Sequence, residues 1–359
     1  MEKQQKVEKQ SLNLEKLVRP NILALSPYHC ARDDYESGLL LDANENAFGP
    51  AVENKDKLNR YPSPRQEKLR SLIADFRSVE MEQVFVGVGS DEAIDLLIRI
   101  FCNPGKDSIL ITPPTYGMYQ VAADINDIKV ISVPLTASFQ LQTDQILQSL
   151  TDQTKIIFLC SPNNPTGNNL NRNDIKTILT QFNGIVVVDE AYIDFSEMES
   201  LASQIDTYPN LVVLQTLSKS FGLAGIRLGL AITSEEIINL MMKVKAPYNI
   251  NQLTSETAIQ ALQNIGKMKN TVKQIIEERE RVRKELEKID TVHIIHPSDT
   301  NFILFEIERA LEVYQELAES GVIVRYRGGQ IHCDNCIRVT IGRPEENDRF
   351  LSQLKKTVS

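Results

Sequence analysis

A single lysine, Lys219, stands among small residues in the stretch TLSKSFGLAGIRLG at 216–229, and Arg227 follows it eight positions later. A lysine amine becomes nucleophilic when burial or a neighbouring cation lowers its pKa. Small neighbours would also let a flat ligand lie against the backbone. Most lysines in such loops are solvated, so this stretch alone leaves a nucleophile and a surface lysine both open.

Groups that could bind an anion or a ring follow two other apolar runs. QVFVGVG at 83–89 is followed by Ser90 and Asp91, at the start of a predicted helix, where free backbone N–H groups can bind an anion. The glycines do not match Gly-x-Gly-x-x-Gly, so a dinucleotide fingerprint is excluded. Tyr116 follows SILITPP and could stack on a ring. A capped helix and a core tyrosine are the open alternatives.

An amide, a carboxylate and a phenol follow the next two runs. Asn164 lies in SPNNPTGN, and turn chemistry explains much of this stretch, although not two prolines around two asparagines. Asp189 ends the run GIVVVDEA, and Tyr192 comes three residues later. A carboxylate at the end of a buried strand is costly unless it is paired, and a cationic ring nitrogen would pair it. A cap on the next turn is the alternative function of Asp189.

The elements that must position these groups are short, continuously apolar strands alternating with helical patterns. Such strands have no wet face, which predicts a mostly parallel sheet covered by helices on both sides. The predicted strands lie at 83–89, 108–114, 129–135, 155–162, 184–191, 210–219 and 226–233. Ligands bind beyond the carboxyl ends of strands in such sheets, so the groups described above should converge. One ligand suits all of them, a flat phosphorylated aromatic aldehyde with a ring nitrogen, which is pyridoxal 5′-phosphate.

The chain changes character near residue 250. A long charged helix is predicted around 267–289, followed by strands at 302–307, 322–327 and 337–342 and by two helices at 310–321 and 345–358. This order predicts a smaller α+β domain. The expected organisation is an N-terminal segment (1–40) that closes over the site, a large cofactor-binding domain (41–250) and a small C-terminal domain (251–359).

Charge, hydropathy and cysteine usage exclude several classes of protein. The net charge of −9 argues against a nucleic-acid partner, and no apolar run approaches the ~20 residues of a membrane span. The five scattered cysteines favour reduced thiols and a cytoplasmic location. Cys333 and Cys336 form a Cys-x-x-Cys beside His332, but no second ligand pair accompanies them. We therefore expect no metal site there and place both thiols on a surface loop or strand.

The chain resembles the fold-type I pyridoxal-phosphate-dependent aminotransferases. The motifs that carry the resemblance occur in the family's order over nearly the whole chain: LDANENAFGP (41–50), RYPSP (60–64), GVGSDEAIDLLIR (87–99), PPTYGMY (113–119), CSPNNPTGN (160–168), VVVDEAY (186–192), LSKSFGLAGIRLG (217–229) and IRVTIG (337–342). Ala47 departs from the proline common at its position, which affects only the rigidity of that loop.

The resemblance implies a role for each matching residue. Lys219 would bind the cofactor as a Schiff base and shuttle the substrate proton. Asp189 would pair with the ring nitrogen, and Tyr192 and Asn164 would bind the ring's phenolic oxygen. Tyr116 would stack on the ring. The remaining assignments are Ser90, Asp91, Ser218 and Arg227 around the cofactor phosphate, Tyr61 toward the partner subunit's cofactor, and Tyr28, Asn44, Arg325 and Arg338 for the substrate.

The resemblance further implies a homodimer that exchanges an amino group between L-glutamate and a phosphorylated imidazolyl ketone, giving histidinol phosphate and 2-oxoglutarate, in histidine biosynthesis. A threonine-phosphate decarboxylase and an aromatic amino-acid aminotransferase would share nearly all the cofactor residues and stay open. A non-catalytic sensor fused to a DNA-binding segment would need a basic helix-turn-helix region ahead of the domain. Only some 40 residues precede the DANEN stretch, which disfavours that alternative.

Overall fold

A seven-stranded sheet forms the centre of the computed structural model, which describes residues 12–35, 38–53 and 58–358. The strand order is β1-β7-β6-β5-β4-β2-β3. β7 pairs antiparallel with β1 and β6, and the other pairs are parallel. The mostly parallel sheet is therefore confirmed. The strands are β1 (Val84–Val88), β2 (Ser108–Ile111), β3 (Lys129–Ser132), β4 (Thr154–Cys160), β5 (Ile185–Asp189), β6 (Leu211–Thr216) and β7 (Leu228–Ile232).

Helices cover both faces of this sheet, as continuously apolar strands require. Alternate residues of β4 divide between the two faces: Phe158 packs in one hydrophobic cluster and Leu159 in another. The first cluster includes residues of α4 (Gly89–Phe101), α5 (Met118–Ile125) and α8 (Glu235–Val244). The second includes residues of α6 (Thr143–Ser149) and α7 (Arg172–Gln181).

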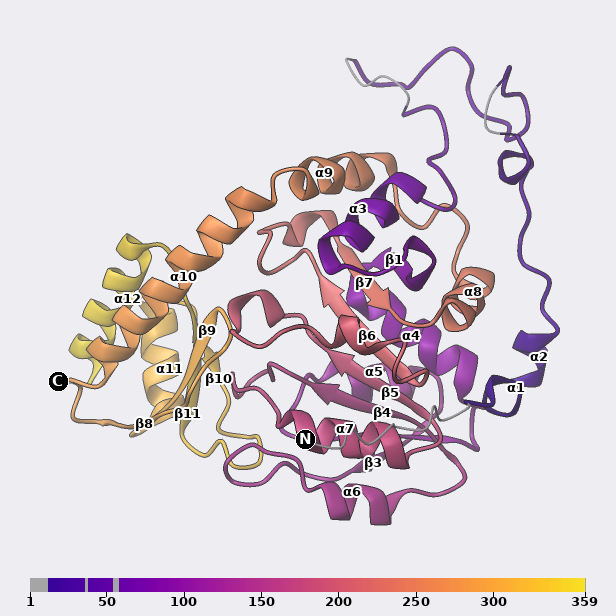
Figure 1. Cartoon of the computed structure of the whole chain (residues 1–359). Helices are drawn as coiled ribbons and strands as arrows, with labels where there is room; N and C mark the ends of the chain where they lie inside the picture. The colour runs from indigo at the N-terminus through magenta and orange to yellow at the C-terminus, as the bar shows by residue number, and fades with distance from the viewer. Residues whose placement is uncertain (1–11, 36–37, 54–57, 359) are drawn as a thin grey trace, which may run out of the picture.

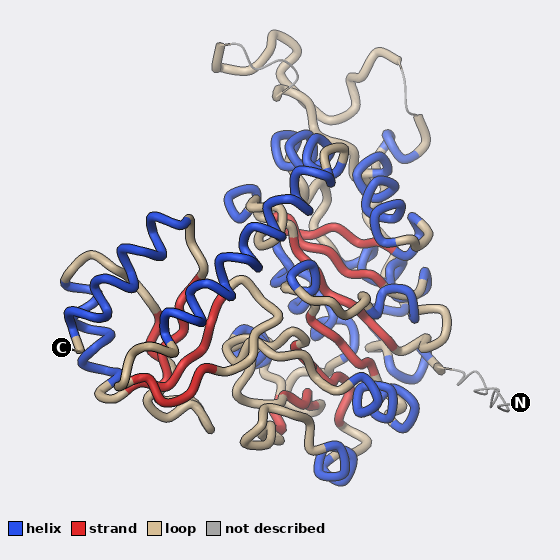
Figure 2. The backbone as a smooth tube through the Cα atoms, turned by 60° about the vertical axis from the view of Figure 1, so that its left-hand side comes forward, coloured by secondary structure: helices blue, strands red, loops and turns tan. Residues whose placement is uncertain are grey.

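A second sheet, fully antiparallel, has the order β10-β11-β9-β8. Figures 1 and 2 show it beside the large sheet, with the long helix α10 running between the two regions. β8 is absent from the strands expected from sequence, and the strand expected at 322–327 is only two residues long. The elements are α10 (Ile265–Leu286), β8 (Val292–Ile295), β9 (Phe302–Ile307), α11 (Ala310–Glu319), β10 (Arg325–Tyr326), β11 (Cys336–Thr340) and α12 (Pro344–Thr357).

The chain between α2 and α3 extends away from the body, at the upper right of Figure 1. We call its described residues 24–35, 38–53 and 58–66 the arm. Phe48 in the arm is fully exposed (102%) and Leu39 nearly so (85%). The helices around the arm and the short 3-10 helices are α1 (Leu14–Leu17), α2 (Pro20–Leu23), α3 (Glu67–Arg77), α9 (Gln252–Leu262), η1 (Ala31–Asp33), η2 (Met81–Gln83), η3 (Ile193–Phe195), η4 (Leu201–Gln204) and η5 (Ala224–Ile226).

The predicted surface position of the Cys-x-x-Cys is wrong. Cys333 and Cys336 are buried and belong to the same hydrophobic cluster as Leu159 and Leu304. The pair therefore lies where β9 and β11 meet the large sheet's helix-covered face, a packing that local sequence does not reveal. None of the five cysteines, all of which lie within the described ranges, forms a disulfide. Within the described ranges, no helix has the length and apolar character needed to cross a membrane.

Candidate active site

A cavity of about 630 Å³ lies beyond the carboxyl ends of β4, β5 and β6, the edge at which the sequence placed the ligand. Its walls come from both sheets. Eleven of the residues predicted for the site line it: Ser90, Asp91, Tyr116, Asn164, Asp189, Tyr192, Ser218, Lys219, Arg227, Arg325 and Arg338. Groups that lie as far apart in sequence as residues 90 and 338 are therefore brought together.

Three predicted site residues lie in the arm and do not line this cavity. Tyr28 is exposed and lines a separate hollow near Arg65. Asn44 and Tyr61 line another with Tyr248, and the rings of Tyr61 and Tyr248 stack with centroids 4.6 Å apart. Their roles toward a ligand stay predictions, because one chain does not bring them to its own cavity.

Lys219 lies on the loop that joins β6 to η5 and points its amine at the cavity. Nζ lies 5.6 Å from the centre of the Tyr192 ring. Burial lowers the pKa of Lys219, and the nearby Arg338 lowers it further. Ser220 Oγ donates to Asp194 Oδ2 at 2.6 Å, which anchors the loop to η3. The amine is thus held where it loses its proton more readily than an exposed lysine does.

Asp189 ends β5 as a buried carboxylate, 3% exposed. Burial raises its pKa to about 6, although hydrogen bonds oppose the shift. Tyr119 Oη donates to Oδ2 at 2.7 Å, and the backbone N–H of Ala191 donates to Oδ1 at 3.1 Å. Lys219 is near enough to interact with this carboxylate electrostatically, but no ion pair to Asp189 is found among the described residues. A protonated ring nitrogen in the cavity would form one.

Tyr119 is a site residue that the sequence interpretation missed. It lies in α5, is fully buried and stacks on Phe158 with centroids 4.8 Å apart. Tyr119 belongs to the motif PPTYGMY, but the sequence gives no reason to distinguish it from an ordinary core tyrosine near the start of a helix. Its partner Asp189 lies 70 positions away, so only the fold shows the hydrogen bond.

Replacing Tyr119 with phenylalanine should raise the pKa of Asp189, because the lost hydrogen bond favours the ionised carboxylate. We expect turnover at neutral pH to fall by about 10-fold and the acidic limb of the pH–rate profile to move to higher pH. Steady-state rates between about pH 5 and 9 test this. A uniform fall without any shift of the limb would argue that Tyr119 only fills space. Tyr314→Phe, on α11, is the matched control.

The start of α4 forms a tight turn beside the guanidinium group of Arg227. Gly89 has a φ of +70° and donates its N–H to the carbonyl of Arg227 at 2.8 Å. A Cβ on Gly89 would lie 2.8 Å from Arg227 Nη2, so glycine keeps room for the guanidinium. A Cβ on Gly229 would lie 2.0 Å from the Ser90 nitrogen, so glycine lets β7 approach the turn. Backbone N–H groups at a helix start and a cation together suit a phosphate.

Asp91 links this turn to the aromatic wall. It accepts a hydrogen bond from Tyr116 Oη at 3.1 Å and lies 3.5 Å from Arg227 Nη2. Tyr116 meets Tyr119 edge-on, with ring centroids 5.6 Å apart. The Tyr116 ring is thus fixed beside the carboxylate of Asp189, where it can cover a flat ligand.

Glu190 directly follows Asp189 in the chain, but its carboxylate lies in different surroundings. It is as buried as Asp189 but accepts from Ser200 Oγ at 2.5 Å and from the Leu201 N–H at 2.8 Å. Arg172 Nη1 lies 3.8 Å away. Glu190 is therefore internally satisfied and structural, whereas Asp189 faces the cavity.

Arginines from the second sheet form the opposite wall. Arg325 and Arg338 are directly paired in the β10–β11 ladder, and Arg327 also lines the cavity. Arg338 donates to Asn164 Oδ1 and lies 5.0 Å from the centre of the Phe302 ring. Arg327 was not predicted as a site residue. Its position within VIVRYR, two residues after Arg325, was the available signal, since alternate residues of a strand share a face.

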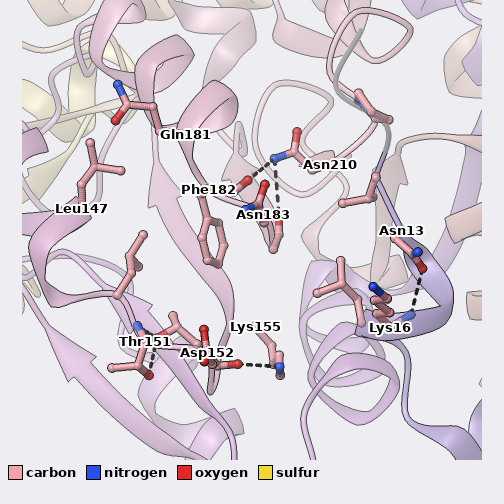
Figure 3. A pocket seen from close by; sticks show the side chains of 16 residues that line it. Asn13, Lys16, Leu147, Thr151, Asp152, Lys155, Gln181, Phe182, Asn183 and Asn210 are labelled. Atoms are coloured by element: carbon pink, nitrogen blue, oxygen red, sulfur yellow. Dashed lines mark hydrogen bonds between the residues drawn. The ribbon is translucent and has the colours of Figure 1, made fainter.

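A larger cavity, of about 820 Å³, lies elsewhere (Figure 3). It is lined by Thr154 and Lys155 at the start of β4 and by Asn210 just before β6, so it lies at the amino ends of the strands. The polar groups that Figure 3 shows there mostly bind backbone: Asn210 donates to the Phe182 carbonyl at 3.1 Å, and Lys155 to that of Asp152 at 2.7 Å. Size alone therefore does not identify the active site.

Comparison with known proteins agrees with this geometry. A family model described as aminotransferase class I and II matches residues 36–354. The histidinol-phosphate aminotransferase of Cytophaga hutchinsonii is 49% identical over 347 residues, which are 96% of this chain and 99% of that protein. The protein of the same name from Parabacteroides distasonis is 46% identical over 96% of this chain and 98% of its own. The solved structure of the histidinol-phosphate aminotransferase of Sinorhizobium meliloti, in complex with pyridoxal-5′-phosphate, matches this chain with a TM-score of 0.78 at 20% identity. The match covers 88% of this chain and 89% of that one, and it supports the fold described above.

Proposed function

Because the chain belongs to the class I and II aminotransferase family, we propose that it exchanges an amino group between L-histidinol phosphate and 2-oxoglutarate. The products would be 3-(imidazol-4-yl)-2-oxopropyl phosphate and L-glutamate, as a step of histidine biosynthesis. The observation that carries the substrate is the arginine wall opposite Lys219, because both substrates end in an anion that guanidinium groups bind well. The names of the curated relatives, which match over 96% of the chain, support the same substrate.

The residues of the cavity fit pyridoxal 5′-phosphate. Lys219 presents a desolvated amine, Asp189 a buried carboxylate without an ion pair among the described residues, and the Gly89 turn backbone N–H groups beside Arg227. When bound, the cofactor supplies an aldehyde that accepts the amino group and a ring that withdraws electrons from the substrate's reacting carbon. We assign Ser90, Asp91, Ser218 and Arg227 to its phosphate, and Tyr116 to the face of its ring.

Four side chains would carry the chemistry. Lys219, whose lowered pKa favours the neutral amine, would take the proton from the substrate's reacting carbon and deliver it to the carbon on the other side of the transferred nitrogen. Asp189 would hold a proton on the ring nitrogen by its negative charge. Tyr192 and Asn164 would bind the phenolic oxygen of the ring. Since the amino group is stored between two substrates, the reaction would proceed by a ping-pong scheme.

Substrate ends would be bound by the second sheet. Arg325 and Arg338 face the cavity from neighbouring strands, and Arg338 is already oriented by Asn164. A guanidinium can form paired hydrogen bonds with a carboxylate or a phosphate, so one site can accept glutamate and histidinol phosphate in turn.

We further propose that two copies of the chain form the active enzyme, in the cytoplasm. The arm supports the dimer, because its exposed apolar side chains, Leu39 and Phe48 among them, have no cover in one copy. Glu45 fixes the arm's shape: it accepts from Arg32 Nη2 and Arg60 Nη1, both at 2.7 Å, and from the Tyr61 N–H at 2.6 Å. In such a dimer Tyr61, and with it Tyr28 and Asn44, would reach the partner's cavity. The lack of disulfides among the described cysteines is consistent with a reducing compartment.

A complementation experiment tests the shared site. Co-expressed Tyr61→Ala and Lys219→Ala chains should form hybrid dimers in which one site has both Lys219 and the partner's Tyr61. We expect each variant alone to be nearly inactive and the mixture to regain up to about a quarter of the wild-type activity, since half of the dimers are hybrids with one intact site. Absence of any recovery, with mixed dimers verified by mass, would contradict a Tyr61 that acts across subunits.

The half-reaction tests the substrate. Mixing cofactor-loaded enzyme with histidinol phosphate, without a keto acid, should convert the bound cofactor to its amine form and release one equivalent of product ketone per site. Conversion by phenylalanine alone would indicate an aromatic aminotransferase. Release of carbon dioxide from threonine phosphate would indicate a decarboxylase. Either result would overturn the proposed substrate while leaving the cofactor assignments intact.

A further inference from the structure

Three guanidinium groups converge on one wall of the cavity. Arg325 and Arg338 are direct neighbours across the β10–β11 ladder. The ladder continues beyond them, since the N–H of Arg327 donates to the Cys336 carbonyl at 2.8 Å. Arg325 and Arg327 are two residues apart and share a face, so all three side chains line the same cavity.

No acid balances this charge. Among the ion pairs of the described ranges, none involves Arg325, Arg327 or Arg338. The acids of the cavity are already engaged, Asp91 beside Arg227 and Asp189 with Tyr119. Like charges placed opposite each other on a sheet repel, so an anion bound on this wall would relieve the repulsion between the arginines.

The side chains of Arg327 and Arg338 differ in the contacts that orient them. Arg338 is oriented by Asn164 and by the Phe302 ring. The Nε atoms of both arginines are buried and have no hydrogen-bond partner. Burial and the neighbouring Arg338 and Arg325 lower the pKa of Arg327 to about 10, which leaves it charged at neutral pH while unsatisfied. The turn after Arg327 is closely built, because a Cβ on Gly328 would lie 2.2 Å from Tyr326 Oη.

The two proposed substrates differ in charge at this end. The distal carboxylate of glutamate carries one negative charge and two oxygens. A phosphomonoester carries close to two charges near neutral pH and three terminal oxygens. Two arginines can pair with one carboxylate, whereas a phosphate brings a further charge and a further oxygen to the same point, which a third arginine can bind.

We propose that Arg327 is a specificity residue that favours phosphomonoester substrates over carboxylates. This inference rests on the proposed function, because it concerns the same cavity. It assigns Arg325 and Arg338 to either anion and Arg327 to the additional charge and oxygen of the phosphate.

The test compares the two half-reactions in Arg327→Gln and Arg327→Lys. In Arg327→Gln, kcat/KM for histidinol phosphate should fall by about 10- to 100-fold, the range expected for one charged hydrogen bond. The value for glutamate should change by less than about 3-fold, and Arg327→Lys should recover part of the loss, since it restores charge without the fork. Arg309→Gln, an exposed arginine at the start of α11, is the control for losing a positive charge.

A second measurement keeps the inference separate from the substrate assignment. Inorganic phosphate should inhibit the glutamate half-reaction of the wild-type enzyme more strongly than acetate does, and Arg327→Gln should remove this difference. If the wild type ignores histidinol phosphate but shows this pattern, the proposed function fails and the inference stands. Equal losses for both half-reactions, or no loss for histidinol phosphate in an enzyme that accepts it, would overturn the inference.

Discussion

Replacing Lys219 with alanine should lower turnover by about four orders of magnitude, because the same amine is proposed to bind the cofactor and to move the substrate proton. The cations nearest Lys219, Arg338 and Arg227, are guanidinium groups, which do not serve as general bases in its place. The fold should be little affected, since Nζ makes no ion pair among the described residues. Rapid-mixing absorbance of the half-reaction measures the loss.

A covalent readout separates chemistry from cofactor binding. Borohydride reduction of the loaded wild type, followed by peptide mass analysis, should place the cofactor on Lys219, and the alanine variant should carry none. The substitution leaves the Gly89 turn and Asp189 unchanged, so the variant should still bind the cofactor non-covalently. Lys176→Ala, an exposed site on α7, controls for loss of a lysine. A reduced adduct on another lysine, or turnover near the wild-type value, would refute the role of Lys219.

The second large effect is expected for Asp189→Asn, which keeps the shape of the side chain and removes its charge. A neutral amide cannot hold a proton on the ring nitrogen, so we expect kcat to fall by about two to three orders of magnitude, as for other preorganised electrostatic groups. The half-reaction rates with each amino donor measure this. An equal fall for every donor, with an unchanged KM, would agree with a role at the cofactor rather than at the substrate. Retention of most activity would contradict it.

Asp189→Asn should also show how much the buried charge of Asp189 lowers the free energy of unfolding. The pKa of Asp189 is about 6 in the fold, against about 3.9 in an unfolded chain. Below the lower value both states are protonated, and no stability is lost. Between about pH 3.9 and about pH 6 the unfolded state has released this proton while the folded state still holds it, so the stability of the cofactor-free protein falls over this range. The loss reaches about 2–3 kcal/mol once Asp189 is ionised in the fold as well.

Urea unfolding of cofactor-free protein near about pH 4 and about pH 7.5 checks this sign. Asp189→Asn should match the wild type at the lower pH and be more stable than it at the higher pH. Addition of pyridoxal phosphate should favour the wild type, because the ring's cation then compensates the carboxylate. A variant less stable than the wild type at both pH values would show that the hydrogen bonds to Asp189, and not its charge, dominate.

Much of the site was predictable because its parts follow strands that are themselves easily recognised. Asp189, Asn164 and Lys219 each come directly after an apolar run, and parallel strands bring such positions to one edge. Their assignment to one cofactor then followed from chemistry. The same logic could not find Tyr119, which lies inside α5 and is recognised only through its hydrogen bond to Asp189.

The second sheet was harder to predict for a related reason. The strand containing Arg325 is two residues long, and its register against β11 determines that Arg327 reaches the cavity. Hydrophobic pattern does not set such a register when so few residues pair. Burial of Cys333 and Cys336 likewise depends on packing against residues over 100 positions away, such as Leu159. Contacts between residues so far apart in the chain cannot be predicted from a local sequence pattern.

The antiparallel course of β7 has a consequence for how this site can change. Because β7 runs opposite to β6, the hairpin between them delivers Lys219 and Arg227 to the same edge from one short segment. That segment is tied at both ends, by Leu217 N–H to the Leu228 carbonyl at 3.2 Å and by Gly89 N–H to the Arg227 carbonyl at 2.8 Å. An inserted or deleted residue there would move the amine of Lys219 relative to the guanidinium group of Arg227. This segment therefore acts as a spacer of fixed length, and in the proposed enzyme it would match the distance between the aldehyde and the phosphate of the cofactor.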